Sequence, residues 1–171
     1  MDISPDGFTV AGGTELCGAE AYIHYWDLRN PDKPLHQPHT STHSDDITVL
    51  HFRPPGAANG SPENVLLSGS TDGLVCTSNA DEDDEDEAVI NVGNWGCSIS
   101  QAGWLPASSA TQPVVWAASD METFSLWNEE VSTISRRLAQ VLNNRHSSIL
   151  CMTLAFEPHR SLVQTPGKPT T

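Results

Sequence analysis

Within 30 residues the sequence contains the three residue types of a serine-hydrolase triad: His43, Ser68 and Asp72. In such a triad the histidine takes the proton of the serine hydroxyl, and the aspartate orients the histidine. A nucleophile elbow places its serine in a G-x-S-x-G motif, whereas Ser68 lies in the sequence LLSGS. Nothing near Ser68 suggests an oxyanion hole. We therefore expect a chain that is not an enzyme and has no catalytic residue.

Histidine and cysteine are the residue types that most often bind zinc. Five histidines fall in a short span, and the four cysteines are scattered along the chain: His24, His36, His39, His43 and His51, and Cys17, Cys76, Cys97 and Cys151. No H-E-x-x-H motif, C-x-x-C pair or mixed Cys/His spacing relates them. We expect strand and loop histidines, reduced thiols, no metal and no cofactor.

Residues 81–87 form the strongest charge feature, a run of seven carboxylates: Asp81, Glu82, Asp83, Asp84, Glu85, Asp86 and Glu87. A calcium-binding EF-hand loop needs alternating ligands and a central glycine, which this run lacks. Adjacent like charges repel one another and are costly to bury. The run predicts a solvated loop, and the alternative is a contact for a Lys/Arg-rich protein partner, whose approach it would accelerate.

The 171 residues carry a formal net charge of −14, and no apolar run approaches the roughly 20 residues of a membrane helix. An acidic surface repels phosphate backbones. We therefore expect no direct nucleic-acid binding and no membrane insertion, and we consider a small-molecule ligand unlikely. An intracellular protein of the cytoplasm, the nucleus or both is the expectation.

A strand-turn-strand pattern recurs along the chain. Residues 65–79, VLLSGSTDGLVCTSN, predict a β-hairpin around the Asp72-Gly73 turn, because glycine accepts the left-handed backbone such turns need. A shift of 49 residues places this hairpin over residues 114–128, and a fainter copy covers residues 9–27. Internal repeats with strand periodicity favour the blades of a propeller.

The S-G-S-x-D-G pattern at residues 68–73, together with Trp26-Asp27 at the end of the first copy, resembles the WD-repeat β-propeller family. Residues 73–105 followed by SDMETFSLW (119–127) are similar, more narrowly, to the subgroup of WD repeat-containing protein 89 and its fungal homologues. The resemblance covers residues 1–130. It implies an all-β, partial propeller of about three four-stranded blades at residues 1–42, 43–93 and 94–130. We expect residues 131–171 to be a divergent segment with a short amphipathic helix and a disordered tail.

The resemblance also implies roles for single residues. WD blades carry a hydrogen-bonded set that pins the blade, and its matching positions in the second repeat are His43, Ser68 and Asp72, with Ser78 where the family has tryptophan. Trp26 and Asp27 match the set in the first repeat, and Trp127 matches it in the third. Residues 1–7 read as a loop, so the first blade is expected to lack its inner strand.

WD propellers are rigid platforms for protein partners. The function implied is a non-catalytic protein-interaction scaffold, with the acidic run 81–87 as its charged contact and Trp104 as an interface anchor. The rival hypothesis is a truncated or mispredicted fragment of a longer WD-repeat protein without a function of its own. A closed propeller usually has some four to eight blades.

Overall fold

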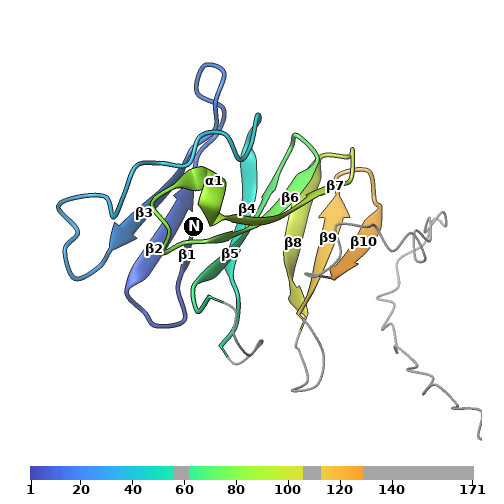
Figure 1. The fold of residues 1–171 in the computed structure, drawn as a ribbon. Coiled ribbons are helices and arrows are strands. Elements are labelled where there is room, and N and C mark those ends of the chain that lie inside the picture. Colours follow the sequence, from blue (N-terminus) through green and yellow to red (C-terminus); the bar gives the residue numbers. More distant parts are fainter. Residues whose placement is uncertain (56–61, 106–112, 129–171) are drawn as a thin grey trace, which may run out of the picture.

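The computed structural model describes residues 1–55, 62–105 and 113–128 (Figure 1). Within these ranges the chain forms three antiparallel sheets and one helical turn. The first sheet has the order β1 (Asp2–Ile3), β2 (Thr9–Gly13), β3 (Ile23–Asp27). The second has the order β4 (Ile47–Phe52), β5 (Val65–Ser70), β6 (Leu74–Asn79), β7 (Val89–Asn94), and α1 (Glu85–Ala88) precedes β7. The third contains β8 (Ile99–Leu105), β9 (Val114–Ser119) and β10 (Phe124–Asn128), with β9 in the middle.

The hairpin of residues 65–79 forms as the turn chemistry predicts. β5 and β6 pair antiparallel, with Leu66 opposite Ser78 and Ser68 opposite Cys76. Gly73 has a φ of 85°, in the left-handed region that favours glycine. The Asp72 side chain accepts a hydrogen bond from Leu74 N at 2.8 Å, which fixes the turn. The second copy also forms an antiparallel hairpin, β9–β10. Its turn has Glu122, with a φ of 58°, where the first copy has Gly73.

The start of the chain departs from the prediction. Asp2 and Ile3 were expected in a loop, but they pair with Ala11 and Val10 of β2 and form a two-residue inner strand. The Asp2 carboxylate also accepts a hydrogen bond from Phe52 N at 2.8 Å, which ties this short strand to β4. The prediction of a loop at residues 1–7 is wrong for Asp2 and Ile3 because the sequence of the segment itself does not show its contact with a residue 50 positions away.

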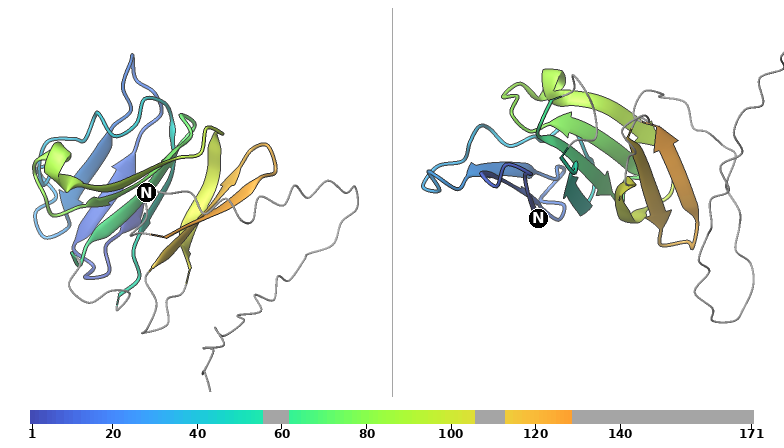
Figure 2. Two further views of the ribbon diagram at one scale, coloured as in Figure 1. Left: turned by 45° about the vertical axis from the view of Figure 1, so that its right-hand side comes forward. Right: turned by 90° about the horizontal axis from the view of Figure 1, so that it is seen from below.

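Two apolar clusters hold the three sheets together. One joins the first and second sheets around Tyr25, Leu66 and Phe52, and the other joins the second and third around Leu67, Val75 and Ile99. Seen from below, the sheets follow one another along an arc, with the N-terminus on the concave side and β7 on the convex side (Figure 2). The described part of the chain is therefore an open, all-β array. The segment 131–171 lies outside the described residues.

Candidate functional site

The structure brings His43, Ser68 and Asp72 together in the second sheet. His43 Nε2 lies 2.8 Å from Ser68 Oγ, and His43 Nδ1 lies 3.2 Å from Asp72 Oδ2. Asp72 also accepts a hydrogen bond from Ser44 N at 2.9 Å. Burial raises the pKa of Asp72, but the hydrogen bonds from His43, Leu74 N and Ser44 N lower it more, so the pKa is below its ordinary value.

These contacts have the order of a hydrolase triad, but their surroundings are those of a structural network. The His43 side chain is 0% exposed and the Asp72 side chain 6% exposed, and Ser68 is fully buried in the middle of β5. A nucleophile must reach its substrate. The arrangement therefore ties the segment before β4 to the β5–β6 turn, since a buried polar group needs such partners.

Ser78, at the position where the family has tryptophan, is buried beside the first sheet. Its cross-strand neighbour Leu66 belongs to the cluster that contains Tyr25. Tyr25 is fully buried, and this burial raises the pKa of its hydroxyl. The Ser78 side chain lowers that pKa, but by less than burial raises it.

The other expected structural residues lie apart from this network. In β3, Trp26 packs against Gly12 of β2 and the His24 ring, and Asp27 pairs with Arg29 at 2.7 Å. In β10, Trp127 Nε1 donates to Ser125 Oγ at 2.7 Å. None of these three residues takes part in the contacts made by His43.

Trp104 of β8 is half-buried against the cluster between the second and third sheets. Its Nε1 donates a hydrogen bond to His51 O at 3.0 Å. This bond fixes the indole between two inner strands, β4 and β8. A partner at Trp104 would therefore contact only the exposed part of a ring that already has a structural role.

The acidic run is divided between internal contacts and solvent. Residues 85–88 form α1, whose N-cap is Asp84, so the expectation of a plain loop is corrected here by one helical turn. Asp81 accepts hydrogen bonds from Asn64 Nδ2 at 3.0 and 3.2 Å. Glu82 is half-buried, and five residues of the run are exposed: Asp81, Asp83, Asp84, Asp86 and Glu87. The Asp84 carboxylate is occupied by the cap bond from Asp86 N.

Glu85 is the residue that fastens this run to the molecule. Its carboxylate accepts hydrogen bonds from Thr40 N, Ser41 N, Thr42 N and Thr42 Oγ1, at 2.7 to 2.9 Å. Burial raises the pKa of Glu85, but these hydrogen bonds outweigh it and hold the pKa below its ordinary value. Sequence reasoning missed this role because the partners are 43 to 45 positions away and carry no local signal.

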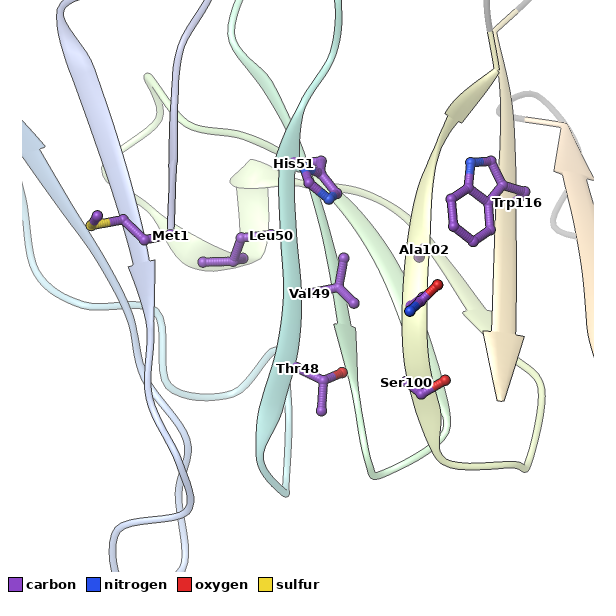
Figure 3. Close-up of a pocket in the computed structure, with 9 residues that line it drawn as sticks. Met1, Thr48, Val49, Leu50, His51, Ser100, Ala102 and Trp116 are labelled. Carbon is purple, nitrogen blue, oxygen red and sulfur yellow. The ribbon is translucent and has the colours of Figure 1, made fainter. Parts of the chain in front are cut away.

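A shallow pocket of about 330 Å³ opens between β4 and β8 on the concave side (Figure 3). Polar and apolar side chains line it, among them Thr48, His51, Ser100 and Trp116. Its walls are the inner strands of neighbouring sheets. Nothing in its lining converges on one point in the way that a catalytic or ligand-orienting group would.

Metal binding and membrane insertion would each need a recognisable feature among the described residues. In residues 1–55, 62–105 and 113–128, no group of three or more His, Cys, Asp or Glu side chains is placed to hold a metal ion. Within the same ranges, no helix has the length and apolar character needed to cross a membrane.

Comparison with known proteins places these features in context. No protein-family model matches the chain. It is 38% identical over 117 residues to WD repeat-containing protein YNL035C of Saccharomyces cerevisiae, an alignment that covers 68% of this chain and 27% of the relative. It is 35% identical over 117 residues to WD repeat-containing protein GTS1 of Arabidopsis thaliana, covering 66% and 26%.

A WD repeat-containing protein 89 homolog of Dictyostelium discoideum is 31% identical over 87 residues, which cover 51% of this chain and 22% of that protein. The chain thus spans about a quarter of the length of the curated relatives it matches. Its three successive antiparallel sheets agree with these alignments. In sequence and in fold, this chain is a WD-repeat protein with the form of a partial β-propeller.

Proposed function

We propose that this chain is a non-catalytic protein-interaction scaffold whose charged contact is the acidic run 81–87. The general role is supported by its WD-repeat relatives. The observation that carries the specific contact is the Glu85 anchor, which holds an otherwise self-repelling segment against residues 40–42.

The anchor leaves a defined set of exposed carboxylates for a partner. Asp83, Asp86 and Glu87 are exposed and accept no hydrogen bond from another described side chain. Charges held in fixed positions lose little conformational freedom when a partner binds. The matching partner is a protein segment rich in Lys and Arg, attracted by a field that salt weakens.

The test uses the full chain and a fluorescent Lys/Arg-rich peptide. The triple variant Asp83→Asn, Asp86→Asn, Glu87→Gln removes three exposed charges and keeps the Glu85 anchor. A matched control, Glu15→Gln, Asp32→Asn, Asp120→Asn, removes three exposed charges elsewhere. We expect the first variant to weaken binding on the order of tenfold near 0.15 M salt and the control to weaken it less.

Equal loss of affinity in the two variants would mean that the peptide responds only to net charge, and the acidic run would be removed from the mechanism. Binding that does not change as salt rises would exclude a charged contact altogether.

A further inference from the structure

β7 is the outermost strand of the second sheet and presents apolar side chains to solvent. Ile90 is 38% exposed and Val92 is 47% exposed, at alternate positions of the strand. In Figure 2, no described strand lies beyond β7 on the convex side. A strand edge of this kind is a template for a further strand, and edges are usually protected by charges, prolines or bulges. The pairing of β7 with β6 has one irregularity, at Ile90, while Val92 lies in the regularly paired part. Both apolar side chains are nevertheless exposed on the edge strand.

The apolar pair is continuous with the anchored acidic run. Val92 is the cross-strand neighbour of Cys76, whose Sγ lies 4.0 Å from Thr42 O. Thr42 is one of the residues held by Glu85, so the same segment borders both features. α1 leads directly into β7, which places Glu87 three positions before Ile90. We call Asp83, Asp86, Glu87, Ile90 and Val92 together the β7 edge.

We propose that the β7 edge binds an extended segment of a partner protein in which Lys or Arg residues alternate with Val, Ile or Leu. The segment adds beside β7 as a further strand, its apolar residues cover Ile90 and Val92, and its basic residues meet the carboxylates of α1. Strand addition draws affinity from main-chain hydrogen bonds and specificity from alternate side chains. The inference rests on the proposed function, because the charge of the occupant comes from the acidic run.

Charge complementarity selects this occupant over a second copy of the chain. Each copy carries a formal net charge of −14, so pairing two copies brings like charges together. A basic, apolar strand instead neutralises three exposed carboxylates and buries two exposed apolar side chains in one contact.

The experiment uses the full chain and two fluorescent peptides of identical composition. One alternates, Arg-Val-Lys-Ile-Arg-Val-Lys, and the other groups its charges, Arg-Lys-Arg-Lys-Val-Ile-Val. We expect the alternating peptide to bind on the order of tenfold more tightly, because only its pattern matches a strand edge. Methylating its backbone nitrogens at the positions that face β7 should abolish binding, since a methylated nitrogen cannot donate.

Protein variants locate the contact. The double variant Ile90→Ser, Val92→Ser should lower the affinity for the alternating peptide on the order of tenfold. The control Leu16→Ser with Met121→Ser changes two side chains that are 42% and 73% exposed elsewhere, and should leave affinity unchanged. Circular dichroism checks the fold of each variant, and Ile90→Thr with Val92→Thr, which keeps strand propensity, replaces the serine pair if that pair unfolds.

Strand addition is overturned if both peptides bind equally, or if the β7 substitutions match the control. If both peptides bind equally and the triple carboxylate variant weakens both, the charged contact of the proposed function stands without the strand. If the alternating peptide depends on Ile90 and Val92 but not on the carboxylates, the edge site stands and the acidic contact fails.

Discussion

Glu85 shows how one residue in a charged run can differ from its neighbours. Six other carboxylates surround it in sequence, yet it alone accepts hydrogen bonds from residues 40–42. A carboxylate that accepts backbone hydrogen bonds stays ionised more easily, because the bonds favour the charged form. The anchor therefore stabilises the fold and at the same time sets where the remaining charges point.

We predict that Glu85→Gln lowers the free energy of unfolding by about 1 to 3 kcal/mol, since an amide presents only one acceptor oxygen to four donors. Because the folded-state pKa of Glu85 is depressed, its stabilisation is present above the unfolded pKa and is lost as pH falls through the folded value. Urea unfolding between neutral pH and about pH 3 measures both effects. The difference between wild type and variant should shrink toward acid.

Glu87→Gln is the matched control, because Glu87 lies in the same turn and is exposed. Its effect should stay within about 0.5 kcal/mol. An equal loss of stability in the two variants, or a Glu85→Gln effect that does not vary with pH, would contradict the anchoring role.

Residue type alone does not show whether a group of side chains is catalytic, because exposure to substrate must also be known. His43, Ser68 and Asp72 are an example. The same three side chains with the same contacts would suggest catalysis at a surface, but here the serine has no exposed area. The resemblance to WD blades groups these three residues, and the structure places His43 within hydrogen-bonding distance of Ser68 and Asp72, which lie 25 and 29 positions away. The burial that decides the chemistry comes from the flanking sheets, whose packing no local pattern encodes.

At the scale of elements, turn chemistry predicts the β5–β6 hairpin, and the 49-residue repeat predicts the β9–β10 hairpin. β5–β6 and β9–β10 occupy the two repeated stretches, because alternation and turn residues are short-range signals. β1 and α1 were missed for one shared reason. Asp2–Ile3 is fixed by β2 and by Phe52, and the acidic turn is fixed by residues 40–42, so both depend on contacts between distant parts of the chain.

Contact between the second and third sheets depends on a glycine in β7. A Cβ built on Gly93 would lie 2.5 Å from Trp127 Cζ3, so the indole of β10 packs directly on the backbone of β7. We predict that Gly93→Ala lowers the free energy of unfolding by about 1 to 3 kcal/mol, because the added methyl group overpacks this contact. In a Trp127→Leu background the same substitution should cost under about 1 kcal/mol, because the ring it meets is gone.

Gly12→Ala is the matched control for this prediction. It also places a Cβ against a tryptophan, but at 3.3 Å from Trp26 Cζ3, so its cost should be smaller. Denaturant unfolding of the four variants measures the coupling between positions 93 and 127. If Gly93→Ala cost the same with and without Trp127, the indole would not be what requires glycine there.

At the scale of the whole molecule, the three sheets leave a lateral face of the array uncovered by described residues. On the third sheet this face carries Trp116 stacked on Phe124, with ring centroids 6.1 Å apart, and Phe124 is 40% exposed. β10 is also the edge strand of that sheet. Apolar faces and strand edges of this kind favour association.

We predict that the chain associates with itself as its concentration rises, which sedimentation velocity measures. In the variant Phe124→Lys, association should require concentrations on the order of tenfold higher. Met121→Lys is the control, because Met121 is 73% exposed in the turn beside this face and the substitution adds the same charge. With a net charge of −14, an added lysine by itself reduces repulsion between copies and would promote association. A weaker association in Phe124→Lys therefore opposes the charge effect and identifies the apolar face, whereas equal behaviour of the two variants would assign association to another surface.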